Sequence, residues 1–296
     1  MGKYPIAKEL GFFRYVKAPV YRLFLPIANF VLRLLPKGFD KKKVDVKKYK
    51  IGKNKFHVVK PKALKENNNP LIFYIHGGGF VFGTAPGHYQ TEQDYALEHN
   101  ALVVGIDYPL APKNKYPYAL NQCYDIYKYL LENEFNIDSN KIILAGDSAG
   151  GLLCLDLYLK IIDESYLKPK GLLLIYPVVD NLENTESMKK YDDTPCWNAK
   201  NNHKMWKYYL GEANYISPLL QIEKFSIDNL YIELTEFDCL HDEGYNLYEA
   251  LKGKISNLVL NDTKGTFHGY DAKRSAKLVV ESRNKQNKFI DEVFNN

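Results

Sequence analysis

The chain has 296 residues, of which 46% are hydrophobic, and this length fits one large α/β domain with an insertion or two small domains. Its four cysteines lack the paired spacing of a zinc site or a disulfide framework, so we expect no metal, free thiols and a cytoplasmic location. The net charge of +5 comes without a nucleic-acid-binding motif, so we expect no nucleic-acid partner.

The charge is concentrated in the amino-terminal part of the chain. Residues 1–53 contain 14 Lys and Arg against three Asp and Glu, a balance of +11, which leaves −6 for the remainder. This segment predicts weak contact with an anionic membrane surface, and the alternative is a solvated lysine-rich face. The apolar stretch 23–32 is interrupted by Pro26 and Asn29 and is shorter than the ~20 residues of a membrane span. We therefore expect neither a transmembrane helix nor a signal peptide.

In chain order, the predicted elements alternate between strands and helices. Residues 1–38 resemble short helical pieces separated by prolines, and 44–50 with 56–60 flank a Gly-Lys-Asn turn, as in an antiparallel strand pair. Helices are predicted at 89–99 and 118–134, after residue 151 and at the carboxy-terminal end. The other strands are predicted at 71–75, 101–106, 142–145, 172–176, 230–234 and 257–260. This order predicts an α/β fold with a mostly parallel eight-stranded sheet and helices on both faces.

Two segments lie outside the strand–helix alternation. One is residues 1–43, and the other is residues 181–225, which are polar at first and then aromatic. We expect both to form a helical cap over the carboxyl ends of the strands, where ligands of open α/β sheets bind. The core is then made of residues 44–180 and 226–296.

The most informative motif is Gly146-Asp147-Ser148-Ala149-Gly150-Gly151, which directly follows a predicted strand and precedes a predicted helix. A serine on such a tight strand-to-helix turn is typical of a nucleophile elbow, in which its Oγ stands clear of the backbone. The flanking glycines allow the sharp turn because they lack Cβ atoms. The alternative interpretation is an ordinary glycine-rich loop with a surface serine.

A second glycine motif, His76-Gly77-Gly78-Gly79-Phe80, follows the predicted strand 71–75. Successive glycines can leave backbone N–H groups free to bind the oxyanion that forms when a serine attacks an ester carbonyl. We expect Gly77, Gly78 and Gly79 to supply such donors together with the N–H of Ala149, which follows the serine. The alternative is a flexible loop.

A serine nucleophile needs a base and an acid that orients the base. If the acid and then the histidine follow the serine in the chain, the candidates for the base are His203, His241 and His268. His268 is favoured because it lies in a loop after the last predicted strand. Asp238, just past the strand 230–234, is the favoured acid, and its rivals are Asp242 and Glu236.

Together these motifs resemble the hormone-sensitive-lipase-like family of α/β-hydrolase esterases, and they occur in the family's order between about residues 70 and 270. The resemblance implies an α/β-hydrolase fold and a triad of Ser148, Asp238 and His268. It also implies an oxyanion hole and a cap built from an amino-terminal segment and an insertion. The motifs are at 76–80, 107–112, 146–151, 236–238, 242–244 and 267–269.

The resemblance implies a serine carboxylesterase that acts on short to medium acyl esters through an acyl-enzyme, without a cofactor. Its partner would be a small-molecule ester, and a homodimer is left open. Asp107 is expected to be a buried hydrogen-bonding residue rather than a catalyst. The alternative function is a non-catalytic ligand-binding protein on a hydrolase scaffold, because a fold does not fix a function.

Overall fold

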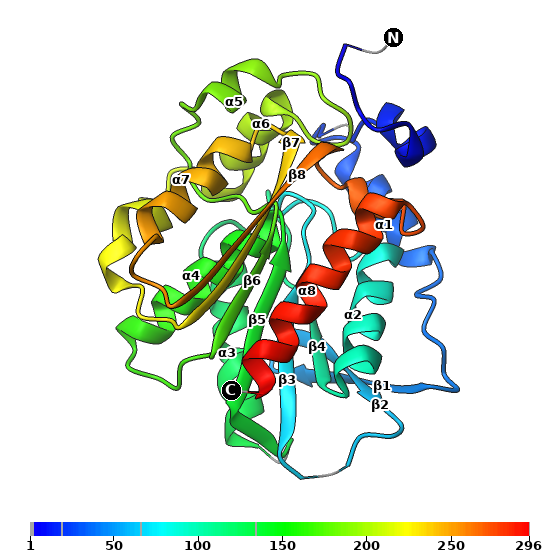
Figure 1. Ribbon diagram of the computed structural model, residues 1–296, viewed down its shortest axis with the longest axis vertical. Helices are drawn as coiled ribbons and strands as arrows, with labels where there is room; N and C mark the ends of the chain where they lie inside the picture. Colours follow the sequence, from blue (N-terminus) through cyan, green and yellow to red (C-terminus); the bar gives the residue numbers. More distant parts are fainter. Residues whose placement is uncertain (1–2, 19, 66, 134, 296) are drawn as a thin grey trace.

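The computed structural model describes residues 3–18, 20–65, 67–133 and 135–295, and a single eight-stranded sheet lies at its centre (Figure 1). The strand order across the sheet is β1-β2-β4-β3-β5-β6-β7-β8. Residues 1–2 of the expected cap, residue 134 of the expected helix 118–134 and residue 296 at the end of the expected core lie outside the described residues. The strands are β1 (Val44–Ile51), β2 (Asn54–Pro61), β3 (Asn69–Ile75), β4 (Leu102–Ile106), β5 (Ile137–Asp147), β6 (Gly171–Ile175), β7 (Asn229–Phe237) and β8 (Asn257–Phe267).

The sheet is mostly parallel, with antiparallel pairing at its β1–β2–β4 end. The β1–β2 and β2–β4 pairs are antiparallel, and all other neighbouring strands are parallel. The eight expected strands and the mostly parallel sheet are therefore confirmed. Because β5, β7 and β8 run the same way, their carboxyl ends meet at one edge of the sheet, which is the upper edge in Figure 1.

Helices cover both faces of the sheet (Figure 1). On one face α2 (Pro86–His99) and α8 (Lys277–Asn295) pack together, and on the other lie α3 (Tyr118–Glu132), α4 (Ala149–Asp163) and α7 (His241–Leu251). The side chains of β3 alternate between two apolar clusters, with Phe73 on the α4 side and Ile72 on the α2 side. Because helices bury both faces of the sheet, the central strands are continuous apolar runs.

The remaining helices belong to the two segments outside the alternation, apart from η3. They lie beside the carboxyl ends of the strands, except for η2, which packs against α4 and α7. The expected boundary at residue 225 therefore includes a piece that contacts the core helices. These elements are η1 (Lys8–Tyr15), α1 (Leu25–Leu34), α5 (Glu186–Lys190), α6 (Ala199–Leu210), η2 (Pro218–Lys224) and η3 (Tyr270–Ala272).

Among the described residues, no helix combines the length and the apolar character needed to cross a membrane. The four cysteines are free thiols, and three of them are buried. Burial raises the pKa of the Cys154 thiol well above its ordinary value, so this side chain acts as an apolar filler of α4.

A buried ion pair joins the antiparallel part of the sheet to α2. His57 Nε2 in β2 lies 2.6 Å from Glu92 Oε2, and both side chains are almost inaccessible to water. Gly105 makes room for the pair, because a Cβ at this position would overlap both side chains. Burial lowers the pKa of His57, but the adjacent Glu92 carboxylate outweighs burial and raises this pKa above 6.5.

We expect Glu92→Gln to lower the free energy of unfolding by about 1–3 kcal/mol at acidic pH, because it leaves a buried imidazole without its anionic partner. A histidine whose pKa is raised by folding adds stability below its unfolded pKa and loses that contribution as pH rises through the folded pKa. The deficit measured by urea unfolding should therefore be larger at pH 6 than at pH 9. Glu249→Gln, on the surface of α7, is the control, and an equal deficit in both variants would contradict the prediction.

Candidate active site

Ser148 occupies a strained turn between β5 and α4. Its φ of 54° and ψ of −120° lie outside the backbone regions that residues with a side chain favour. Such a conformation costs about 1–3 kcal/mol of folding free energy. The turn is held by a hydrogen bond of 2.8 Å from the Ser148 N–H to the carbonyl of Ile175. Two glycines make the crossing of strand and helix feasible. A Cβ at Gly150 would overlap the carbonyl oxygen of Ile75, and one at Gly146 would overlap the backbone of Gly150.

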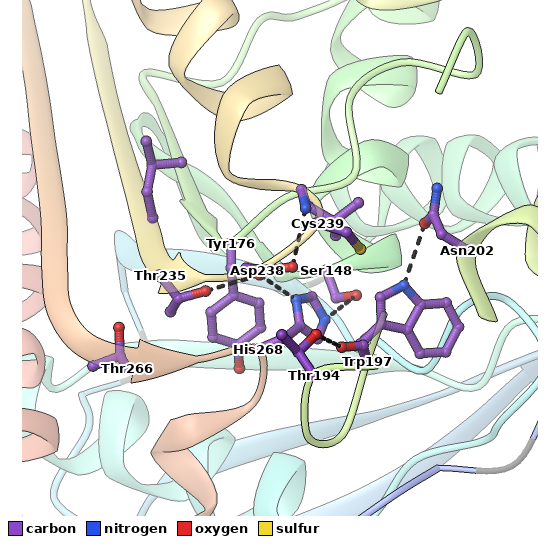
Figure 2. A network of polar contacts seen from close by, with 12 residues as sticks. Ser148, Tyr176, Thr194, Trp197, Asn202, Thr235, Asp238, Cys239, Thr266 and His268 are labelled. Atoms are coloured by element: carbon purple, nitrogen blue, oxygen red, sulfur yellow. Dashed lines mark hydrogen bonds and ion pairs between the residues drawn. The ribbon is translucent and has the colours of Figure 1, made fainter. Parts of the chain in front are cut away.

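Three side chains from the ends of three strands form a hydrogen-bonded chain (Figure 2). Ser148 Oγ lies 2.8 Å from His268 Nε2, and His268 Nδ1 lies 2.7 Å from Asp238 Oδ2. The Asp238 carboxylate also accepts the hydroxyl of Thr235 at 2.8 Å and the N–H of Leu240 at 3.0 Å. All three members of the chain are buried. The favoured sequence candidates thus lie together, in an arrangement that can pass a proton from the serine to the imidazole.

The rival candidates lie elsewhere. His203 is 76% exposed on α6, and His241 contacts the carboxylate of Asp242 rather than the serine. Asp242 also accepts a backbone N–H of α5. Glu236 accepts the N–H of Gly265 at 2.7 Å.

The glycine loop after β3 does not present all of its N–H groups in the same way. The N–H of Gly77 donates to Asp147 Oδ1 at 3.0 Å, so it is already engaged. Within the described residues, the N–H groups of Gly78 and Gly79 donate to no protein acceptor. The N–H of Ala149 is the first of α4 and has no acceptor within its helix. The N–H groups of Gly78, Gly79 and Ala149 are therefore available to an oxyanion. The N–H of Gly77, expected to be a fourth donor, instead anchors the loop to Asp147.

Asp147, one residue before the serine, is the anchor of this loop. Its carboxylate also accepts the hydroxyl of Tyr74 at 2.7 Å and lies 3.5 Å from His88 Nε2. Burial raises the pKa of Asp147, but the charge of His88 and these hydrogen bonds outweigh burial and lower it to about 2. Burial, together with the neighbouring His88, lowers the pKa of His76 to about 4. A fixed carboxylate thus holds the start of the glycine loop beside Ser148.

Two aromatic side chains that sequence reasoning missed enclose the imidazole (Figure 2). The ring centroids of Tyr176 and Trp197 lie 4.7 Å and 6.1 Å from that of His268. Trp197 also contacts the glycine loop, since a Cβ at Gly79 would overlap its ring. Its Nε1 donates to Asn202 at 3.2 Å. Tyr176 is the last residue of the predicted strand 172–176 and directly follows the observed β6, so it could have been suspected from that place. Nothing in the spacing around Trp197 indicates its position.

Two further expectations concern residues beside the site. Asp107 is exposed rather than buried, and it accepts a hydrogen bond of 3.3 Å from Thr84, because it lies just beyond the end of β4 where water reaches the chain. In the part of the chain that the structure describes, no cluster of three or more His, Cys, Asp and Glu residues could hold a metal ion.

The geometry can be compared with known proteins. The sequence profile of the α/β hydrolase fold matches residues 72–272, more than half of the chain, which includes all the residues of the hydrogen-bonded chain. The chain belongs to the α/β-hydrolase family. Its curated relatives include hormone-sensitive lipase of Bos taurus, which is 37% identical over 119 residues covering 40% of this chain and 16% of that protein. The resemblance to hormone-sensitive-lipase-like esterases is thereby confirmed.

Other members of the family match over more of the chain. A putative α/β hydrolase of Acanthamoeba polyphaga mimivirus is 31% identical over 212 residues, which cover 68% of this chain and 59% of that protein. Esterase LipI of Mycobacterium tuberculosis is 28% identical over 209 residues, which cover 68% of this chain and 65% of that protein. The chain thus matches less than two thirds of the length of these two relatives. The solved structure of a bacterial heroin esterase is 26% identical, covers 98% of both chains and superposes with a TM-score of 0.82.

For this α/β hydrolase we expect Asp147→Asn to lower both stability and ester turnover. A carboxylate whose pKa falls from 3.8 to about 2 on folding contributes on the order of 2 kcal/mol above its unfolded pKa. That contribution is lost as pH falls through the folded value, so the deficit should be complete at pH 7. Urea unfolding and nitrophenyl acetate turnover, with the exposed Asp228→Asn as the control, measure both effects. Wild-type stability at pH 7 in Asp147→Asn would contradict the anchoring role.

Proposed function

We propose that the protein hydrolyses carboxylic esters with Ser148 as nucleophile, His268 as base and Asp238 as the orienting acid. The observation that carries this proposal is the continuous hydrogen-bonded chain of 2.8 Å and 2.7 Å from the serine hydroxyl to the buried carboxylate. The names of the curated esterase relatives support the same reaction class.

The first step forms an acyl-enzyme. His268 Nε2 takes the proton of Ser148 Oγ as this oxygen attacks the ester carbonyl carbon. Asp238 accepts the Nδ1–H of the imidazole, which fixes the tautomer and stabilises the imidazolium. The imidazolium then protonates the alkoxide leaving group, so the C–O bond breaks and an alcohol departs.

The negative oxygen of the tetrahedral intermediate needs donors that are already in place. The N–H groups of Gly78, Gly79 and Ala149 are the donors we assign, and each such bond typically lowers the barrier by about 2.7–4 kcal/mol. In the second half of the reaction, His268 takes a proton from water, the hydroxide attacks the acyl carbon, and Ser148 leaves with the returned proton. No cofactor takes part in either half.

The substrate class we propose is a short to medium acyl ester of small size. Aromatic side chains enclose the space next to the nucleophile, among them Trp197 beside Gly79. Tyr176 adds a second ring beside the imidazole, with its centroid 4.7 Å from that of His268. These apolar rings favour an alkyl group of limited length.

Several parts of the functional organisation stay predictions. We retain a cap formed by residues 1–43 and 181–225 over a core of residues 44–180 and 226–296. A cytoplasmic location, a homodimer and weak membrane-surface contact likewise stay predictions.

Replacing the nucleophile is the direct test of ester hydrolysis. Ser148→Ala should lower kcat/KM for nitrophenyl butyrate by roughly ten-thousandfold or more, because the imidazole then has no hydroxyl to activate. Ser256→Ala, on the surface, should retain wild-type activity. Equal rates for wild type and Ser148→Ala would rule the mechanism out, and tight ester binding without any turnover in the wild type would favour the non-catalytic alternative.

A graded series of nitrophenyl esters tests the substrate class. We expect the highest kcat/KM between acetate and octanoate and a decrease of at least about tenfold from octanoate to palmitate, because long chains outgrow the aromatic enclosure. Activity that rises steadily to palmitate would contradict the proposed chain length.

A further inference from the structure

Helix α1 is amphipathic, but its apolar side faces water. Ile27, Phe30, Val31 and Leu34 follow the spacing i, i+3, i+4 and i+7 that places side chains on one face of a helix, and all four are exposed. A surface helix normally turns such a stripe toward the core. Only Leu25 of α1 is fully buried.

The side of α1 that faces the protein is held by a polar residue. Asn29 Nδ2 donates to the carbonyl of Val81 at 2.8 Å, and Asn29 Oδ1 accepts the N–H of Gly83 at 2.8 Å. Both partners belong to the loop that follows Gly79. The orientation of α1 is therefore fixed by specific contacts, and its apolar stripe is directed away from the protein.

The exposed stripe is part of a larger apolar surface, which we call the amino-terminal surface. Ten of the seventeen exposed large hydrophobic side chains of the described residues lie between residues 12 and 35. Leu23 is 81% exposed and Phe12 is 76% exposed. The ten are Phe12, Tyr15, Tyr21, Leu23, Phe24, Ile27, Phe30, Val31, Leu34 and Leu35.

The amino-terminal surface is also purely basic. Residues 10–39 contain five Lys and Arg and no Asp or Glu, and Lys17, Arg22 and Arg33 are exposed among the apolar side chains. Exposed apolar groups interspersed with cations are the combination that binds at an anionic lipid interface. The chain beyond residue 53 has a net charge of −6. The electrostatic field of the molecule therefore orients the basic amino-terminal surface toward a negatively charged surface.

From these contacts and charges we infer that the amino-terminal surface docks on an anionic phospholipid membrane, with the apolar stripe of α1 lying in the headgroup region. A second copy of the chain is the other candidate occupant. A symmetric dimer would place the same five cations against each other, whereas anionic lipid neutralises them. The inference goes beyond ester hydrolysis, because docking requires no turnover.

Docking at this surface would bring the proposed catalytic site to the membrane. Residues 16–18 pair with the segment that carries Trp197. The N–H of Cys196 donates to the carbonyl of Val16 at 2.7 Å, and the N–H of Ala18 donates to the carbonyl of Cys196 at 3.3 Å. Asn29 contacts the loop after Gly79, which begins at the proposed oxyanion donors. The lipid-bound segment thus borders the site on two sides, and an ester that partitions into the membrane would be presented next to Ser148.

Sedimentation of the full chain with vesicles tests the inference. We expect the protein to pellet with equimolar phosphatidylglycerol and phosphatidylcholine at low salt, much less at high salt, and not with pure phosphatidylcholine. Arg22→Gln with Arg33→Gln should lower the partition coefficient about 30-fold, whereas Lys48→Gln with Lys53→Gln on the β1–β2 hairpin should change it little. Ile27→Ser, Phe30→Ser and Leu34→Ser together should reduce pelleting at least tenfold.

The controls separate docking from folding and from catalysis. Replacing Leu167, Leu220 and Val280 together by Ser removes three exposed apolar side chains outside the amino-terminal surface, and this variant should bind anionic vesicles as the wild type does. Circular dichroism verifies that every variant is folded. Ser148→Ala should pellet as wild type, so loss of turnover and loss of docking are distinguishable. A wild type that stays in solution with anionic vesicles at low salt would overturn the inference. So would a dimer in light scattering that the α1 triple change dissociates without any effect on vesicle binding.

Discussion

The structure depends on one close approach, where helix α4 crosses the end of strand β3. The backbone of Gly150 lies against the carbonyl of Ile75 so tightly that no side chain fits between them. This contact sets the distance between the nucleophile turn and the glycine loop, which begins directly after Ile75. Ser148 is forced into its unfavourable backbone conformation by the same crossing, and the surrounding sheet stabilises that strain. The turn at Ser148, the proposed oxyanion donors and the start of α4 thus form one structural unit.

Much of this unit could be predicted from the sequence, because its requirements are local. A buried strand is a run of apolar residues, and a turn without room for Cβ atoms needs glycine, so Gly146 and Gly150 carry the signal themselves. Asp238 and His268 were predictable because parallel strands bring their ends together. Tertiary contacts were not predictable in this way. Trp197 reaches His268 through a long insertion without periodicity, and the engagement of Gly77 depends on a carboxylate 70 residues away.

The amino-terminal segment combines a basic and apolar composition with an unusual orientation. Its basic and apolar residues are visible in the sequence, but the direction in which the apolar stripe faces is not. Asn29 decides the orientation of α1, because its two hydrogen bonds to the loop after Gly79 attach the helix by its polar side. The same contacts connect the amino-terminal surface to the loop after Gly79, so the proposed membrane-docking surface adjoins the proposed catalytic site.

The central claim is that Ser148 is the nucleophile of an ester hydrolase, and covalent trapping tests it most directly. A nitrophenyl phosphonate should react once per chain, with Ser148 Oγ bonding to phosphorus and nitrophenolate leaving, and peptide mapping by mass spectrometry should place the adduct on Ser148. Replacing His268 by Ala should slow this labelling strongly, because the hydroxyl then lacks its base. An adduct on another residue, or labelling as fast without His268 as with it, would contradict the account.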